Sequence, residues 1–437
     1  MVGVPLAALL LLGPGVRPPP AEACAFLRTP STYEAEKARA SYLATLDAAS
    51  VDALFEGDSY FGLPAVEVGD RGQRVAGARQ LPAVLLKAIA WEESTLTMAS
   101  RSTRFESTGP ALVSFDCGHG VMQVTTGMTV PLGSAGEPTP RQVSVATHYG
   151  YNIARGAAML VEKWNQAPET RPVVGVDIAS EPAVIENWYY AVWSYNGFTG
   201  PGSNSSNHPL DPSFGAWPRS RYQCDGTQSR RRYPYQELVW GCMASPPERE
   251  GARLWTPVPA TLPDLTQPGF FEPLSLRNWV FPYSALDIPV PRPLHVDFTP
   301  AIARGFRERL FGTPRLEITE ESVLIRLNAL PRDARATVRV ANVGSGILSW
   351  VASSDVSWLV VDPPAGVALG LDVSCPTPYC ERMAELTITV NPTLLPNANT
   401  RGTLIFRSAS GVGTERLLRV EVDGDFEVAA PGTSRAY

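Results

Sequence analysis

The spacing of hydrophobic residues changes twice along this chain of 437 residues, and these changes constrain the fold more than any single motif does. The pattern of residues 24–244 is mostly helical. Residues 245–313 are rich in proline, which is excluded from the interior of a helix. Residues 314–424 contain short runs with a period of two, which predict β-strands. We therefore expect a multidomain protein, with a mainly α domain followed by an all-β sandwich.

The predicted sandwich depends on five β-branched runs separated by turn residues such as Asn342–Gly346. The runs are 323–327, 336–340, 386–390, 403–406 and 417–422. Short strands at this spacing indicate an immunoglobulin-like β-sandwich. Trp350, the segment Ser353–Leu359 and Pro363–Gly366 resemble BACON-type immunoglobulin-like modules. Sandwiches commonly bury tryptophan, so we expect at least one of Trp350 and Trp358 in the core. An exposed one would offer a platform for a glycan, and the alternative for the module is a protein contact or a spacer.

Residues 1–23 resemble a secretory signal, although no Lys or Arg precedes the apolar run Val2–Gly13. The sequence Ala21-Glu22-Ala23 is a small-x-small cleavage site before Cys24. Cleavage there would leave Cys24 at the N-terminus, which raises the alternative of a lipid anchor. Ala21 argues against this alternative, because lipoproteins usually have Leu at that position. The apolar run is too short to cross a membrane. We expect an exported protein that is extracellular, periplasmic or associated with the cell envelope, with a flexible tail over 425–437.

The six cysteines fit an exported protein as well. Cys224 and Cys242 close one short loop and Cys375 and Cys380 another, and disulfides there would suit an oxidising compartment. Free, buried thiols are the alternative. No cysteine or histidine spacing matches a zinc site, so we expect no metal and no cofactor. The net charge of −6 without a basic tail gives no sign of nucleic-acid binding.

Residues 245–313 connect the two domains and combine prolines with aromatic residues. A segment so rich in proline is extended. A free linker would not need aromatic side chains, so we expect this segment to pack on the helical domain. Its aromatic residues are Trp255, Phe270, Phe271, Trp279 and Phe281.

One predicted helix carries two adjacent carboxylic acids. Pro82 suits the first turn of this helix, because a backbone N–H there would have no partner within the helix and proline has none. Leu86, Ile89 and Glu93 then fall on one apolar face. Glu92 lies about 100° away around the helix, so we expect it closer to solvent. An apolar wall disfavours the charged carboxylate, which predicts that the pKa of Glu93 rises toward neutral pH, as a general acid requires.

Three short segments, in this order, resemble the soluble lytic transglycosylases, goose-lysozyme-like enzymes that cut bacterial peptidoglycan. They are Glu93-Ser94, Gly120-Val121-Met122-Gln123 and Tyr195-Asn196. The resemblance implies a lysozyme-like catalytic domain over 24–244, with peptidoglycan glycan strands as the substrate. It also implies that Glu93 acts first as the acid and then as the base, so that cleavage of the MurNAc-GlcNAc β-1,4 bond forms a 1,6-anhydro-MurNAc end.

The same resemblance implies roles for the neighbouring residues. Ser94, Gly120, Met122, Gln123, Tyr195 and Asn196 are the expected substrate-binding residues. The Tyr195 hydroxyl is expected to contact Glu93, and Asn196 to position substrate. A second helix over 145–164 carries Gly156, which permits close helix contact. A third helix carries Val184 to Tyr195 and ends at Gly197, which suits a left-handed cap.

Two further readings of the helical domain stay open. Asp116 and His119 lie in a long loop, either as an auxiliary acid and a proton shuttle or as ordinary surface residues. A hydrolytic muramidase on the same fold, with Asp116 as base, is the first alternative function. A non-catalytic wall-binding protein is the second.

Overall fold

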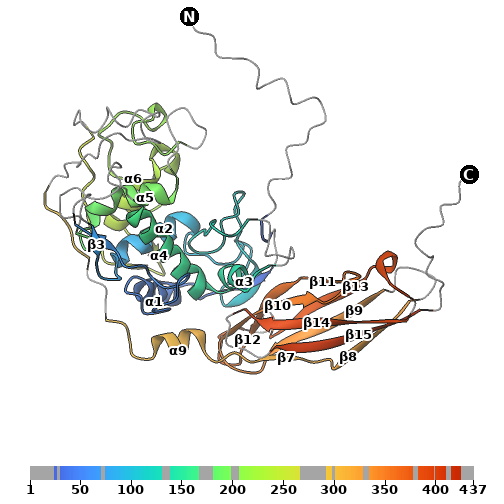
Figure 1. Ribbon diagram of the computed structural model, residues 1–437. Helices are drawn as coiled ribbons and strands as arrows, with labels where there is room; N and C mark the ends of the chain where they lie inside the picture. The colour runs from blue at the N-terminus through green and yellow to red at the C-terminus, as the bar shows by residue number, and fades with distance from the viewer. Residues whose placement is uncertain are drawn as a thin grey trace, which may run out of the picture.

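The computed structural model describes twelve stretches of the chain, and they form an N-terminal mixed α/β region and a C-terminal β-sandwich (Figure 1). The stretches are 24–26, 30–69, 74–129, 138–166, 181–197, 206–265, 292–297, 301–327, 334–376, 382–397, 399–409 and 415–424. The predicted signal over 1–23 and the tail over 425–437 lie outside them. No helix in these stretches has the length and apolar character needed to cross a bilayer.

The N-terminal region contains helices together with three small antiparallel sheets. Its α-helices are α1 (Ala40–Ala49), α2 (Ala83–Ser94), α3 (Pro140–Thr147), α4 (Tyr149–Asn165), α5 (Tyr189–Tyr195) and α6 (Tyr235–Ala244). The strand pairs are β1 (Ser31–Glu34) with β4 (Ser107–Pro110), β2 (Glu67–Val68) with β3 (Val75–Ala76), and β5 (Glu248–Arg249) with β6 (Ala252–Arg253). The short strands make this region mixed, where the sequence pattern predicted helices alone.

Helix α2 carries both adjacent acids, and its predicted start at Pro82 is confirmed. Pro82 is its N-cap residue, and the carboxylate of Asp297 accepts a 2.7 Å hydrogen bond from the Val84 N–H. Such an acceptor satisfies one of the backbone donors that every helix start leaves free. Nearly every side chain of α2 is buried, including Lys87. The helix ends where Thr95 takes the left-handed conformation, at φ 59°.

The helix predicted over 145–164 is two helices, because the chain turns between them at His148. His148 has extended backbone angles, and its Nδ1 accepts a 3.0 Å hydrogen bond from the Gly150 N–H at the start of α4. Gly156 has the predicted role of permitting close contact. A Cβ at this position would lie 2.4 Å from Met122 Cβ, so only glycine lets the Met122 chain approach α4.

The third predicted helix begins with a 3₁₀ turn, η2 (Ile185–Trp188), and continues as α5. Trp188 packs against Trp164 of α4, with 4.3 Å between the ring centroids. Gly197 follows at φ +84°, which confirms the predicted left-handed residue after the helix.

The C-terminal sandwich is confirmed, and all five predicted strand runs are strands in it. One sheet has the order β12-β10-β14-β15-β8 and the other β11-β13-β9-β7. The strands are β7 (Leu316–Ile318), β8 (Ser322–Leu327), β9 (Arg335–Asn342), β10 (Ile347–Ser354), β11 (Leu359–Asp362), β12 (Ala365–Leu369), β13 (Met383–Val390), β14 (Thr400–Ser408) and β15 (Arg416–Gly424). Trp350 and Trp358 are both buried in the core between the sheets. This confirms the expectation that at least one of them lies in the core, and neither is exposed as a glycan platform would have to be.

The sandwich packs directly on the N-terminal region through α3 and β1 (Figure 1). The Thr147 hydroxyl of α3 lies 2.7 Å from the Ser349 hydroxyl of β10, and both side chains are buried. The Tyr33 hydroxyl of β1 donates a 2.6 Å hydrogen bond to the Ser374 carbonyl. Val351 and Val367 belong to the hydrophobic core of the N-terminal region. The two parts therefore share buried surface and buried hydrogen bonds.

The described parts of the connecting segment lie against the N-terminal region. Trp255 is buried there, and its indole N–H donates a 3.2 Å hydrogen bond to the Cys242 carbonyl. Short helix α9 (Phe306–Phe311) places Phe311 against Tyr151 and His148. Phe270, Phe271, Trp279 and Phe281 lie outside the described residues.

Disulfides join the cysteines, so the alternative of free thiols is wrong. Cys224 pairs with Cys242 as predicted. Cys375 is also disulfide-bonded, and Cys380 lies outside the described residues. Cys24 pairs with Cys117, a pairing that the sequence did not suggest. This disulfide occupies the sulfur to which a lipid anchor at Cys24 would be attached.

Candidate active site

Glu93 lies near the end of α2 as a partly buried carboxylic acid. Its Oε1 accepts a 2.5 Å hydrogen bond from the hydroxyl of Tyr235, the first residue of α6. Burial raises the pKa of Glu93 from 4.5 to about 7, while the Tyr235 hydrogen bond opposes that rise and the neighbouring charge of Glu92 adds to it. The carboxyl group is therefore partly protonated at neutral pH, which a general acid requires.

Glu92 is more deeply buried than its neighbour, which corrects the expectation that it faces solvent. Its side chain is 1% exposed and forms an ion pair with Arg230, at 2.6 Å between Oε2 and Nη2. Arg230 also donates a 2.7 Å hydrogen bond to the Glu92 carbonyl. Burial raises the pKa of Glu92, and the Arg230 charge opposes that rise. Helical geometry alone missed this because α6 and its preceding loop cover that side of α2.

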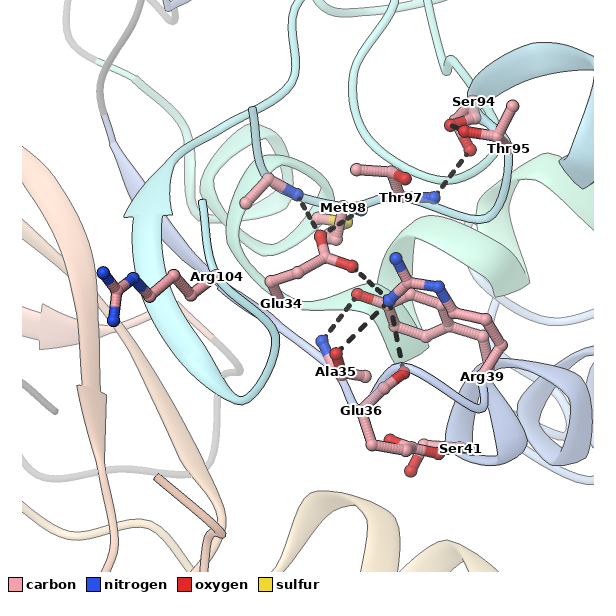
Figure 2. A network of polar contacts seen from close by, with 12 residues as sticks. Glu34, Ala35, Glu36, Arg39, Ser41, Ser94, Thr95, Thr97, Met98 and Arg104 are labelled. Atoms are coloured by element: carbon pink, nitrogen blue, oxygen red, sulfur yellow. Dashed lines mark hydrogen bonds and ion pairs between the residues drawn. The ribbon is translucent and has the colours of Figure 1, made fainter. Parts of the chain in front are cut away.

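The last turn of α2 is tied to the segments after it by Ser94 (Figure 2). The Ser94 hydroxyl lies 2.8 Å from the Val121 carbonyl and accepts a 3.0 Å hydrogen bond from the Thr97 N–H. With 2% of its surface exposed, Ser94 makes these contacts inside the protein. It therefore positions the Glu93 backbone and the Gly120–Gln123 turn, and the predicted direct contact with a substrate is not available to it.

A buried ion pair fixes the segment just beyond Ser94 (Figure 2). The carboxylate of Glu34 accepts hydrogen bonds from the N–H groups of Met98 and Ala99, at 2.9 and 2.8 Å. The same carboxylate pairs with Arg39 at 2.5 Å, and both side chains are almost fully buried. Unpaired buried charges are costly, so each partner holds the other in place. This pair anchors the strand β1 to the chain that leaves α2.

The turn Gly120–Gln123 is held by Asn152 of α4. The Asn152 amide oxygen accepts a 2.9 Å hydrogen bond from the Met122 N–H, and its Nδ2 donates to the His119 carbonyl at 2.7 Å. Gly120 has φ +66°, and a Cβ there would lie 2.7 Å from Asn152 Nδ2. Glycine is thus required both by the backbone angle and by the close approach.

Within this turn, Met122 and Gln123 have different surroundings. Met122 is fully buried against Gly156, so it is a core residue and not an apolar contact for a sugar. Gln123 is partly exposed at φ 45°, and its Nε2 donates a 2.8 Å hydrogen bond to the Gly120 carbonyl. Its side-chain oxygen is the polar atom of the turn that is available to a ligand.

Tyr195 and Asn196 lie at the end of α5, close to the same turn. The Tyr195 hydroxyl donates a 2.8 Å hydrogen bond to the Met122 carbonyl. The hydroxyl contact with Glu93 that the resemblance assigned to Tyr195 is thus made by Tyr235. Asn196 is exposed, and its Oδ1 accepts a 3.0 Å hydrogen bond from Asn207. Tyr195 supports the turn, and Asn196 remains open to a ligand.

The loop that carries Asp116 and His119 separates the two residues. Asp116 is exposed, accepts a 2.5 Å hydrogen bond from the Ser114 hydroxyl, and its charge contributes to the raised pKa of Glu93. His119 is fully buried, with Nδ1 2.6 Å from the Cys117 carbonyl. Burial lowers the pKa of His119 to about 4. A buried, neutral histidine cannot exchange protons with a substrate, so only Asp116 is a candidate auxiliary group.

The one group of potential metal ligands among the described residues is Glu92, Cys224 and Cys242. The two sulfur atoms form a disulfide with each other, and a metal binds the thiolate form of cysteine. The group is therefore a structural element that fixes the loop carrying Arg230.

Sequence reasoning missed Tyr235, which contacts Glu93, and Arg230, which contacts Glu92. Both lie in the segment between Cys224 and Cys242, where three arginines, Tyr233 and Tyr235 occur within a few positions. That concentration of polar aromatic and cationic residues inside a predicted disulfide loop is the signal that was available.

Comparisons with known proteins give the fold of one part only. No family model and no curated protein matches the chain. The C-terminal immunoglobulin-like, PapD-like sandwich has structural neighbours. The E. coli chaperone DraB has 13% identity and TM-score 0.20 over 26% of this chain and 56% of its own length.

Two other neighbours are equally distant. The periplasmic chaperone SfaE has 10% identity and TM-score 0.21 over 26% of this chain and 60% of its own. The PapD-like domain 7 of human CEP192 has 11% identity and TM-score 0.20 over 25% of this chain and 83% of its own. Each chaperone is thus matched over less than two thirds of its length. At these TM-scores the likenesses carry no argument about activity or partners.

Proposed function

We propose that this protein is an exported lytic transglycosylase that cleaves the MurNAc-GlcNAc β-1,4 bond of peptidoglycan and leaves a 1,6-anhydro-MurNAc end. The observation that supports this most is the carboxyl group of Glu93, whose pKa is raised to about 7 by burial. Glu93 is part of a series of motifs whose order resembles that of the soluble lytic transglycosylases. The site needs no metal or cofactor for this chemistry.

In the proposed reaction Glu93 acts twice. Its protonated carboxyl group donates a proton to the glycosidic oxygen, and the bond between that oxygen and C1 of the MurNAc residue breaks. The ionised Glu93 then removes the proton of the C6 hydroxyl of the same sugar. The C6 oxygen bonds to C1, which closes the anhydro ring and returns the proton to Glu93. No water is consumed and no second carboxylate is required, in contrast to two-carboxylate glycosidases.

The surrounding residues would support this cycle in a defined way. The Tyr235 hydroxyl, 2.5 Å from Glu93 Oε1, stabilises the ionised form. Gln123, which is partly exposed, and Asn196, which is exposed, offer amide groups for sugar hydroxyls or N-acetyl groups. Ser94, Gly120, Met122 and Tyr195 have supporting roles, because their side chains or backbone hold the turn and α2 together.

The experiment that tests this function is mass spectrometry of purified peptidoglycan after digestion by the wild type and by Glu93→Gln. Anhydro-muropeptides from the wild type alone are expected. Glu385→Gln is the matched control, because Glu385 is an exposed acid on the sandwich that pairs with Arg339 at the surface. Products from Glu93→Gln at the wild-type rate would refute the proposal.

The same digest distinguishes the hydrolytic alternative. Asp116 is exposed, and its charge acts on Glu93, which is the arrangement that a second carboxylate would need. Reducing-end muropeptides, lost in Asp116→Asn, would identify a lysozyme with Asp116 as the base. The absence of any product would leave a wall-binding role.

We propose further that the sandwich is a BACON-type module that acts as a rigid spacer. Both of its candidate tryptophan platforms are buried, and its α3 contact is built from buried hydrogen bonds. The disulfides Cys24–Cys117 and Cys224–Cys242 support the export of the protein to an oxidising compartment.

A further inference from the structure

A cavity on the other side of α2 from Glu93 is lined by cations and aromatic rings. Its volume is about 630 Å³, and it lies between α2, the loop after Cys224 and the β5–β6 hairpin. Trp91 and Thr95, one helical turn apart on α2, form part of its wall. Arg230, Arg249 and Arg253 also line it. None of these residues belongs to the set that contacts Glu93 directly.

Two of the three arginines already have acidic partners. Arg230 pairs with the buried Glu92 at 2.6 Å. Arg253 lies 3.7 Å from Glu248, and both of those side chains are exposed. Arg249 differs, because no carboxylate lies within ion-pair distance of it in the described part of the chain.

Arg249 is held in a position that leaves its charge uncompensated. Its guanidinium lies over the Trp91 ring at 5.3 Å from the centroid. Its Nε is buried and has no hydrogen-bond partner. Burial and the nearby charge of Arg39 lower the pKa of Arg249. A buried, unpaired donor on a cation is costly in free energy, and an anionic ligand would remove that cost.

The cavity wall contains two acids, Glu248 and Asp225. Asp225 is hydrogen-bonded within its own loop. It accepts hydrogen bonds from the Thr227 N–H and hydroxyl, at 2.9 and 2.6 Å. No ion pair joins Asp225 to Arg249 in the described part of the chain. The cavity combines one unpaired guanidinium with a tryptophan ring, a combination that fits a carboxylate attached to a small apolar or amide-bearing group.

We propose that this cavity binds the carboxylate of an acidic peptide, with Arg249 as the partner of the carboxylate and Trp91 as the surface for the adjoining amide or methyl group. The proposal rests on the proposed function for the source of the peptide, because the glycan strand that Glu93 would cleave carries short acidic peptides. Trp91 and Glu93 lie in the last turn of α2 but point to different sides of it. The peptide would therefore pass the end of the helix at Thr95, which lines the cavity, to reach Arg249.

Binding is measured on Glu93→Gln protein, in which the proposed cleavage is blocked, so the result does not depend on activity. The probes are N-acetyl-L-Ala-γ-D-Glu-L-Lys, the same peptide with its carboxylates amidated, and inorganic phosphate, each titrated by calorimetry. We expect the acidic peptide to bind and the amidated peptide to bind at least tenfold more weakly, since a charge-assisted hydrogen bond contributes that much.

Three variants locate the site. Arg249→Gln should weaken the acidic peptide roughly tenfold, and Arg249→Lys by less, because lysine keeps the charge without the fork of donors. Arg335→Gln is the control, since Arg335 is an exposed arginine on β9 of the sandwich. If Arg249→Gln does not fold, Trp91→Phe tests the same cavity. The peptide should change the indole fluorescence of the wild type, and this change should be lost in Trp91→Phe.

Equal binding of the amidated peptide, or binding unchanged in both Arg249→Gln and Trp91→Phe, would overturn the proposal. So would binding of phosphate alone, which would indicate a site for inorganic anions. Peptide binding by a protein that never cleaves glycan would keep the cavity as a peptide site and refute only the proposed function.

Discussion

The Tyr235 hydroxyl donates a 2.5 Å hydrogen bond to Glu93 Oε1, although 142 positions of the sequence separate the two residues. Tyr235 is the first residue of α6, and α6 packs against α2 along its length. The buried environment destabilises the ionised form of Glu93. The hydrogen bond from Tyr235 stabilises that form. The balance of these opposing effects sets the pKa of Glu93 near neutrality.

Removing the Tyr235 hydroxyl should move the pH dependence of activity. In Tyr235→Phe the hydrogen bond to the charged form is lost, so the pKa of Glu93 should rise above about 7. The alkaline limb of the pH–rate profile should then shift to higher pH. Tyr233→Phe is the control, because Tyr233 shares the loop but contacts the Ser220 hydroxyl. Identical profiles for Tyr235→Phe and wild type would show that Glu93 is not the titrating group.

Replacing Glu93 with glutamine should stabilise the fold at high pH. The folded protein holds the proton on Glu93 up to about 7, while the unfolded chain releases it near 4.5. The folded state thus binds more protons between these values, and the stability of the wild type falls as the pH rises through that window. The shift corresponds to about 3 kcal/mol.

Urea unfolding at pH 8 and pH 4.5 measures this difference. Glu93→Gln should exceed the wild type by up to about 3 kcal/mol at pH 8 and match it at pH 4.5. Glu385→Gln serves again as the exposed control. An equal difference at both pH values would mean that the effect is not linked to protonation of Glu93.

The Glu92–Arg230 pair should be coupled energetically. Arg230→Gln leaves a buried carboxylate without its partner, which should lower the free energy of unfolding by about 1–3 kcal/mol. Because the Arg230 side chain is 47% exposed, the lower end of that range is expected. The double variant Glu92→Gln/Arg230→Gln should lose less than the sum of the single variants. Strict additivity in the double-mutant cycle would show that the pair contributes nothing.

The Cys24–Cys117 disulfide should stabilise the N-terminal region considerably. It joins residues 93 positions apart, so the cross-link removes much of the entropy of the unfolded chain. The chain-entropy model gives about 4–5 kcal/mol for a loop of this length. Cys24→Ser/Cys117→Ser, compared with the wild type by urea unfolding under non-reducing conditions, should show a loss of that order. A loss below about 1 kcal/mol would contradict it.

A close packing contact supports the turn beside the acid. Gly156→Ala would place a Cβ 2.4 Å from Met122 Cβ, which forces the Met122 chain away from α4. We expect a loss of about 1–3 kcal/mol in the free energy of unfolding. The stability of Gly156→Ala is compared with that of Ala157→Gly, which changes a buried neighbouring residue without adding atoms. Unchanged stability in Gly156→Ala would mean that the turn moves freely.

Several features followed from local sequence because local physics decides them. Period-two runs predicted the strands of the sandwich, since alternation is imposed by the pleat itself. Pro82 and Gly197 marked the limits of their helices, because backbone angles and the missing N–H of proline act within one turn.

Other features were decided by segments distant in the sequence. Glu92 is the more buried acid because the loop with Arg230 covers its side of α2, and no spacing within α2 contains that information. Tyr235 makes the contact with Glu93 that was expected of Tyr195 for the same reason, because the packing of α5 and α6 selects which hydroxyl reaches Glu93. Trp358 lies in the turn before β11 and is buried close to Gly402 of β14, a contact that the residues around Trp358 do not show.

The sequence by itself determined where the strands of the sandwich and the limits of α2 and α5 form, because these depend on contacts within a few residues. Only the tertiary structure decided which groups surround that acid and how its pKa is set. It also decided that Cys24 pairs with Cys117, and that Arg249 is left with Trp91 and no acidic partner among the described residues. Burial and charge pairing depend on every segment that packs nearby, and the order of residues along one helix does not specify those segments.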